Sequence, residues 1–157
     1  MTGWKVGAVS FTLGAKLASP ARDAAADAAL VRRVLETARS GDMDAAMSLA
    51  ETALAGGLEH PLLFNLAAAR HEAEGRLEDA LGLLQRANVL DPRDVGVRQA
   101  LGLVLHRLER HEEALSHFDA VVAAQPGLAA VHSARGLTLE ALGELRQAQV
   151  RRHGPSL

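Results

Sequence analysis

Cysteine is missing from the 157 residues, which excludes disulfides and thiol chemistry and leaves the compartment open. A surplus of either charge is missing too: the formal net charge is −2, and apart from Lys5 and Lys16 the basic residues are arginines that alternate with acids. Such a balance provides no basic footprint for nucleic acid. No run approaches the roughly 20 consecutive apolar residues that a membrane span requires. We therefore expect a soluble, cytoplasmic protein whose partners include neither nucleic acid nor a membrane.

Residues 1–18 stand outside the pattern that organises the rest of the chain. Their apolar run, Val6 to Leu13, is interrupted by small and polar residues. A signal peptide has a purer apolar run and a cleavage site of small residues. We interpret this segment as a disordered or loosely packed leader, and export is the alternative. The first helix is expected from about Pro20, with Ser19 as its cap, to Arg39.

A pattern between Gly75 and Pro92, GRLEDALGLLQRANVLDP, returns at a fixed distance of thirty-four residues. The copies are ERHEEALSHFDAVVAAQP at 109–126, GDMDAAMSLAETALAGGL at 41–58 and a fourth that begins with GELRQA at 143–148. Each copy has the same small residue near its start, and these are Ala46, Ala80, Ala114 and Ala148. A repeat of this length is typical of stacked helical hairpins, none of which buries its apolar face alone. The richness in Ala, Leu, Glu and Arg also favours helix throughout.

The residues in this frame resemble the tetratricopeptide repeat motif, which has Trp-x2-Leu-Gly-x2-Tyr in the first helix and Ala-x3-Phe and a later Pro in the second. The unit that starts at Val95 supplies Leu101, Gly102, Leu105, Ala114, Phe118, Val121 and Pro126. The resemblance implies an all-α fold of tandem antiparallel hairpins, an α-solenoid of about three and a half repeats. It divides the chain into an array at 19–150, with units of about 27–60, 61–94, 95–128 and 129–150, and a tail at 151–157.

Two departures from the motif leave alternatives open. Asn65-Leu66-Ala67 resembles the family's Asn-Leu-Gly one residue out of frame, so a rotated helix would turn Phe64 and His71 toward the binding face. After Gly143 a second helix is expected to begin and to end before Gly154, although Arg152 stands where a large apolar residue belongs. This short helix is interpreted either as a polar cap or as the start of a longer array of which the chain is a piece.

Catalytic and metal sites are not indicated. His71 with Glu74, and His106 with Glu109, lie three residues apart on a helix, but neither pair has a clear third ligand. The Gly-Gly pair at 56–57 follows a helix and does not open a strand–turn–helix phosphate site. We expect no catalytic residue, no cofactor and no bound metal.

A binding face follows from the resemblance, because in this family the first helix of each hairpin lines a concave groove. Equivalent positions then stack into rows, and the candidate residues are Asn65, Glu72, Gln99, Leu103, His106, Arg107, Ser133, Leu137 and Glu140. Polar groups beside an apolar strip suit an extended peptide, and the alternative is an ordinary solvated face. Neighbouring rows are expected about 10 Å apart, too far for side chains to meet one another. His106 and Arg107 are expected to take no part in holding the hairpins together.

The sequence therefore predicts a protein-interaction scaffold that binds a protein or peptide and is not an enzyme. The alternative is an accessory or regulatory arm of a larger bacterial enzyme of the sulfotransferase or hydroxylase type, from which this chain would be a truncated piece. A ligand with a C-terminal carboxylate is disfavoured, because the rows contain no lysine and one asparagine. Four leucines, Leu137, Leu139, Leu142 and Leu145, predict self-association through residues 136–150.

Overall fold

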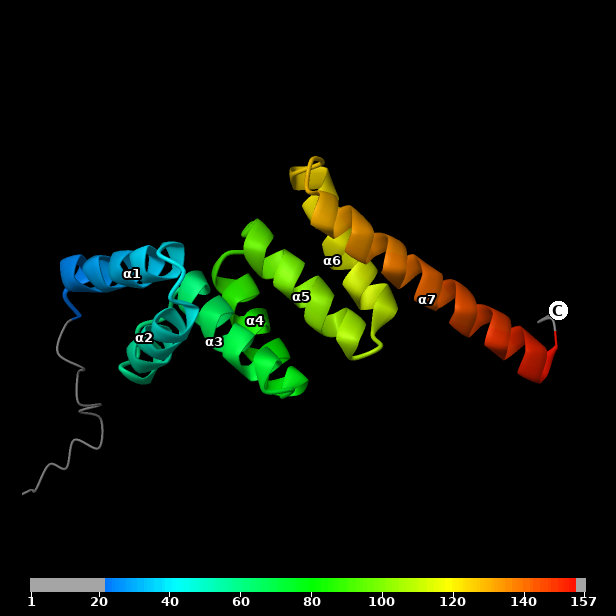
Figure 1. Ribbon diagram of the computed structural model, residues 1–157, viewed down its shortest axis with the longest axis horizontal. Coiled ribbons are helices and arrows are strands. Elements are labelled where there is room, and N and C mark those ends of the chain that lie inside the picture. The colour runs from blue at the N-terminus through cyan, green and yellow to red at the C-terminus, as the bar shows by residue number, and fades with distance from the viewer. Residues whose placement is uncertain (1–21, 155–157) are drawn as a thin grey trace, which may run out of the picture.

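The computed structural model describes residues 22–154, and this part of the chain consists of helices and short turns (Figure 1). The helices are α1 (Ala24–Arg39), α2 (Met43–Ala55), α3 (Pro61–Ala73), α4 (Leu77–Leu90), α5 (Val95–Arg107), α6 (His111–Ala124) and α7 (Ala129–His153). The predicted start at Ser19 and Pro20, like the leader at 1–18, lies outside the described residues.

Aspartates at the helix starts explain several of these boundaries. The carboxylates of Asp23, Asp42 and Asp94 accept hydrogen bonds from backbone N–H groups in the first turns of α1, α2 and α5, each at 3.0 Å. A carboxylate there satisfies an N–H group that has no partner inside the helix and lies at the positive end of the helix dipole. In α3, Pro61 takes the first position and His60 Nδ1 accepts from Leu62 N at 3.1 Å.

The turns inside the hairpins use one repeated position in a left-handed conformation. Gly41 and Gly75 have φ values of 92° and 75°, and Glu109, thirty-four residues after Gly75, has φ 60°. Glycine adopts this conformation without a steric penalty, whereas a residue with a Cβ pays a cost of about 1–2 kcal/mol. The turn at Glu109 therefore forms against the local preference of its residue, because the packing of α5 on α6 requires it.

Gly143 occupies the next equivalent position, but the predicted turn there is wrong: α7 continues through it to His153 as a single helix. A hairpin needs a second helix with an apolar face to fold back onto the first. The positions equivalent to Phe118 and Val121 of α6 are Arg152 and Pro155 in this copy. A glycine permits a turn without enforcing one, so the chain stays helical where folding back would bury no apolar surface.

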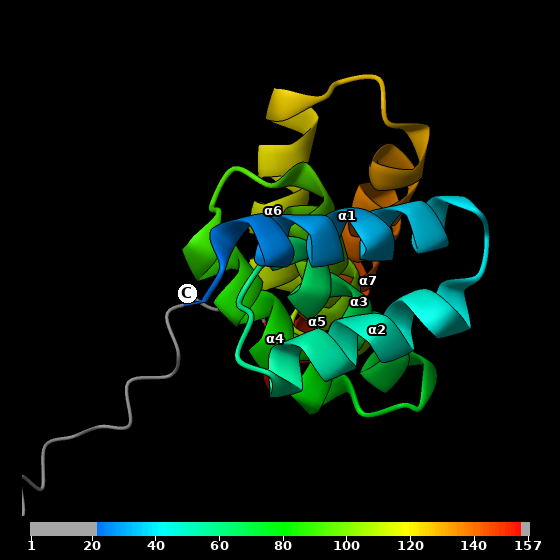
Figure 2. The ribbon, with the colours of Figure 1, turned by 90° about the vertical axis from the view of Figure 1, so that its left-hand side faces the viewer.

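The helices form two layers that extend along one axis, as Figure 1 shows. One layer contains the first helix of each hairpin. In this layer α1 contacts α3, α3 contacts α5, and α5 contacts α7. The second helices, α2, α4 and α6, each pack between two of the first helices. Viewed end-on, α1 and α2 cross in front of the later hairpins (Figure 2). The all-α fold of tandem antiparallel hairpins predicted from the sequence is confirmed.

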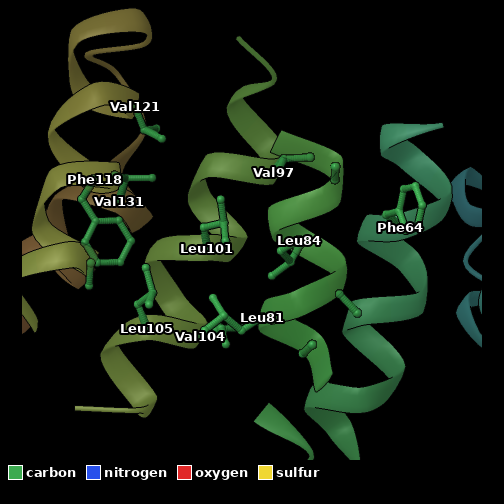
Figure 3. Close-up of a cluster of buried hydrophobic side chains, with 14 residues drawn as sticks. Phe64, Leu81, Leu84, Val97, Leu101, Val104, Leu105, Phe118, Val121 and Val131 are labelled. Carbon is green, nitrogen blue, oxygen red and sulfur yellow. The ribbon is translucent and has the colours of Figure 1, made fainter. Parts of the chain in front are cut away.

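The apolar core runs between the two layers in two clusters. One joins α1, α2 and the start of α3 around Val34, Ala50 and Leu63. The other extends from Phe64 to Val131 and is drawn in Figure 3, where side chains of α4 and α5 interdigitate and Phe118 closes the opposite side of α5. Phe64 is buried in this cluster. The rotated register that would turn Phe64 toward the binding face is therefore wrong.

A glycine at the crossing of α5 and α6 makes room for the ring of Phe118. A Cβ on Gly102 would lie 2.7 Å from Phe118 Cδ1 and 2.8 Å from Cζ, far inside normal contact. Gly136 has the same repeat position in α7, yet a Cβ there would meet no atom within 4 Å. Gly136 has open space beside it because no second helix folds back onto α7. The residue equivalent to Phe118 in this copy is Arg152.

The same substitution is therefore expected to have opposite effects at these two glycines. Gly102→Ala should lower the free energy of unfolding by about 1–3 kcal/mol, because the methyl group overpacks against Phe118. Gly136→Ala should raise it by about 0.4–1 kcal/mol, because alanine restricts the unfolded chain and fits the helix. Urea unfolding followed by circular dichroism measures both values. A stabilising Gly102→Ala would show that the two helices do not cross as closely as described.

Candidate functional site

The nine residues predicted from the sequence lie on three neighbouring first helices, and we call them the candidate face. They are Asn65 and Glu72 on α3, Gln99, Leu103, His106 and Arg107 on α5, and Ser133, Leu137 and Glu140 on α7. Leu103 and Leu137 are large apolar side chains with exposed fractions of 38% and 59%. The remaining members are half-buried or exposed, so the face offers side chains to solvent along all three helices.

An ion pair connects α3 and α5 on this face. Arg107 Nη1 lies 2.9 Å from Glu72 Oε1, and both side chains remain partly exposed. The expectation that side chains in neighbouring rows hardly meet one another is therefore wrong, because the long arginine side chain bridges the two helices. The pair neutralises Glu72 within the face, although an exposed pair of this kind contributes only about 0–1 kcal/mol to stability.

His106 connects α5 to α7 through a hydrogen bond with Thr138. His106 Nδ1 lies 3.0 Å from Thr138 Oγ1, and that hydroxyl also lies 2.8 Å from the carbonyl oxygen of Ala134. Since the single hydroxyl proton is donated to Ala134, the network assigns the imidazole proton to Nδ1, which donates to Thr138. The His106 ring also faces that of His111, with 5.0 Å between the ring centroids.

The expectation that His106 takes no part in holding the hairpins together is therefore wrong. His106 contacts both α6, through His111, and α7, through Thr138. Thr138 was not among the predicted residues, but the repeat contained a signal for it. The equivalent position in α5 is the fully buried Val104, and threonine has nearly the same shape. A buried hydroxyl group needs hydrogen-bond partners: the carbonyl oxygen of Ala134 accepts its proton, and His106 provides the second bond, to its oxygen.

Burial changes the titration of two histidines next to these contacts. The pKa of His106 lies below its ordinary value of 6.5, because partial burial disfavours the charged imidazolium and His111 lies close by. The pKa of His117 on α6 is lowered as well, first by burial and then by the positive charge of Arg98. Both imidazoles are therefore neutral at physiological pH and take up protons only on acidification.

The described part of the chain has neither a metal-ligand cluster nor a membrane-spanning helix. Among residues 22–154, no group of three or more His, Cys, Asp or Glu side chains is placed to hold a metal ion. Within the same residues no helix is both long and apolar enough to cross a membrane. The polar groups of the candidate face are amides, a hydroxyl, a salt bridge and a hydrogen-bonded imidazole, which are recognition groups.

Stacked antiparallel hairpins whose first helices adjoin define the class of helical-repeat solenoids. Residues 71–138 match the family model described as tetratricopeptide repeat, from the end of α3 to the buried Thr138 of α7. Over these residues the chain matches the same family that the sequence motif indicated, and the likeness to solved structures supports the fold over most of the rest. No curated protein matches the chain.

Solved structures with the same fold include three tetratricopeptide repeat domains. The first such domain of Spaghetti (RPAP3), bound to the HSP90 peptide SRMEEVD, has a TM-score of 0.65 and 16% identity over 77% of this chain and 96% of that chain. The Sgt2 domain from Aspergillus fumigatus has a TM-score of 0.63 and 20% identity over 77% and 82%. The second domain of human RPAP3, in complex with the HSP70 peptide SGPTIEEVD, has a TM-score of 0.57 and 18% identity over 69% and 91%. At these identities the likeness concerns the fold.

The lowered pKa of His106 and that of His117 predict a stability that falls on acidification. A group with a depressed pKa binds fewer protons in the folded than in the unfolded chain, so stability is complete above the unfolded value of 6.5 and decreases as the pH falls below it. The midpoint of thermal unfolding should therefore decrease between about pH 7.5 and about pH 5.5. His106→Asn keeps a nitrogen near Thr138 and does not titrate, so its decrease should be smaller. An undiminished decrease in His106→Asn would remove His106 as a cause.

Proposed function

We propose that this chain is a protein-interaction scaffold that holds an extended peptide against the candidate face. The observation that carries the proposal is the pair of exposed leucines, Leu103 and Leu137, at equivalent positions of adjoining helices. Covering large apolar side chains with a partner removes their surface from water, which favours binding.

Polar groups flank this apolar row on both sides. Gln99 and Ser133 precede the two leucines by four residues, and His106 and Glu140 follow them by three, so each group lies one helical turn away. A peptide that crosses α5 and α7 would place alternate side chains over the leucines. Its backbone N–H and C=O groups would meet the amide and hydroxyl groups beside them. This arrangement fits an extended peptide better than a compact ligand.

The charge of the candidate face favours a neutral or basic peptide. Glu140 is exposed, and the cation of Arg107 is already paired with Glu72. No lysine is available on this face to neutralise a carboxylate. The acidic peptide SRMEEVD in the Spaghetti structure is therefore a poor match for these side chains. We infer that the partner differs in charge from the peptides that the two RPAP3 domains hold.

Substitution of Leu103 tests the proposal. Peptides selected from a random display library against the full chain serve as probes, and fluorescence anisotropy measures their Kd. Leu103→Asp should weaken binding by tenfold or more, which corresponds to about 1.4 kcal/mol, because it places a charge in the apolar row. The control is Met43→Asp on α2, where the methionine has a similar exposed fraction of 44% and lies outside the three helices of the candidate face.

The outcomes of this experiment separate clearly. Unchanged binding in Leu103→Asp would move the site off the candidate face, and an equal loss in Met43→Asp would show that neither effect is local. The SRMEEVD peptide is a second probe and should bind more weakly than the selected peptides. If it bound the parent as tightly as they do, the preference for a neutral or basic partner would be wrong.

We further propose that two copies associate through the free part of α7. This helix continues past α6 (Figure 1), and Leu145 and Val150 on it have exposed fractions of 50% and 52%. The acidic residues Glu140 and Glu144 precede the basic pair at 151–152. Two such helices in antiparallel orientation would bring opposite charges together while covering the apolar side chains.

Leu145→Asp combined with Val150→Asp tests this association. The parent should show a molecular mass that rises with concentration in light scattering, and the double variant should remain monomeric over the same range. Both residues are exposed, so the circular dichroism spectrum should be unchanged. A parent that stays monomeric at every concentration would contradict the proposal.

A further inference from the structure

The outer face of α4 carries a hollow that belongs to neither proposed binding surface. We call this hollow the outer pocket. It has a volume of about 340 Å³ and is lined by Glu59, Phe64, Gly82, Arg86, Val89 and Leu90. Its floor is apolar, and the exposed fraction of Val89 reaches 79%. The guanidinium of Arg86 lies 5.1 Å from the centre of the Phe64 ring and also pairs with Glu59 at the rim.

The outer pocket is specific to one hairpin and is not a general feature of the repeat. At the positions equivalent to Val89 and Leu90, α6 has Ala123 and Ala124, and the α2 copy has Ala55 and Gly56. Large apolar side chains at positions that are small elsewhere, and exposed to this degree, indicate that something covers them. Gly82 leaves the middle of α4 open, because a Cβ there would meet no atom within 4 Å.

The start of the described chain is bonded to the turn that also forms the rim of this pocket. Arg22 Nη1 donates a hydrogen bond of 2.7 Å to the carbonyl oxygen of Gly56, in the turn between α2 and α3. Glu59, three residues further along the same turn, forms the rim of the outer pocket. Residues 1–21 therefore precede a residue that is held at the same turn as Glu59. Fully extended, the eighteen Cα–Cα steps from Trp4 to Arg22 would span about 60 Å, so the length of the segment does not prevent Trp4 from reaching the pocket.

The composition of residues 1–21 complements the outer pocket. They contain both lysines of the chain, the single tryptophan Trp4, and no acidic residue. Of the 17 basic and 19 acidic residues, two basic ones lie in this segment, so the rest of the chain has a formal charge of −4. Trp4 is followed directly by Lys5, so an apolar ring and a cation come together, as do the apolar lining of the pocket and the carboxylate of Glu59, which the cation would share with Arg86. Phe11, the other aromatic residue in the segment, has uncharged neighbours on both sides.

We propose that residues 1–21 bind the outer pocket of their own chain, with the indole of Trp4 on the apolar floor formed by Phe64 and Val89 and with Lys5 near Glu59. An indole buries a large apolar area with few rotatable bonds, so it suits a small open hollow. The segment then acts as an internal ligand on the outer face. This assignment is independent of the peptide proposed for the candidate face, which lies on the layer of first helices.

Trp4 provides its own probe, because its fluorescence is the only tryptophan emission of the full chain. In the folded parent, the emission should be shifted to shorter wavelength than in the chain unfolded by guanidinium chloride, and acrylamide should quench it less. Val89→Asp should abolish both differences. Gly82→Leu should abolish them too, because the leucine fills the hollow and favours helix over glycine. The matched control is Ala123→Asp, which places the same charge at the equivalent exposed position of α6 and should behave as the parent.

Three results would overturn the proposal. Parent emission and quenching equal to those of the unfolded chain would show that Trp4 is exposed. Unchanged emission in both Val89→Asp and Gly82→Leu, with circular dichroism spectra like the parent's, would place Trp4 elsewhere. A blue shift that disappears on dilution would assign the segment to a pocket on a second copy and not to its own.

Discussion

The close crossing of the two helices in each hairpin is the constraint on which the rest of this structure depends. Small residues permit it: Ala46, Ala80 and Ala114 are fully buried at one repeated position, and Gly102 leaves space for the Phe118 ring. Two helix backbones approach each other this closely only where the residues between them are small. The stacking of hairpins, the layer of first helices and both apolar clusters follow from this approach.

The end of the array shows what happens when the crossing has no partner. Ala148 has the same repeat position as the three buried alanines but is exposed, because no second helix folds back at Gly143. The local residues permit a turn, and the apolar side chains that would stabilise a returning helix are missing. α7 therefore remains straight, and the exposed leucine and valine on its free part are a direct consequence.

Some side chains of the candidate face also hold the helices of the fold together. Arg107 bridges to Glu72, and His106 bonds to Thr138, so two of the nine residues also join neighbouring helices. Contacts between first helices thus use the same side chains that a ligand would meet. The proposed binding at this face would therefore be coupled, through these two residues, to the packing of α5 on α3 and α7.

The sequence by itself determined the all-α class, the period and the register of the hairpins, because small and apolar residues recur at positions that only helix crossings require. It also placed the candidate residues on three adjoining helices. Only the tertiary structure decided that α7 is one helix, that His106 joins α5 to α7, and that Glu109 adopts the left-handed backbone conformation that glycine usually takes. It alone revealed the outer pocket, although Val89 and Leu90 in place of alanines were visible in the chain. The reason is physical: periodicity reports which face of a helix is buried, whereas side-chain partners and the balance between turning and continuing depend on what the neighbouring helices supply.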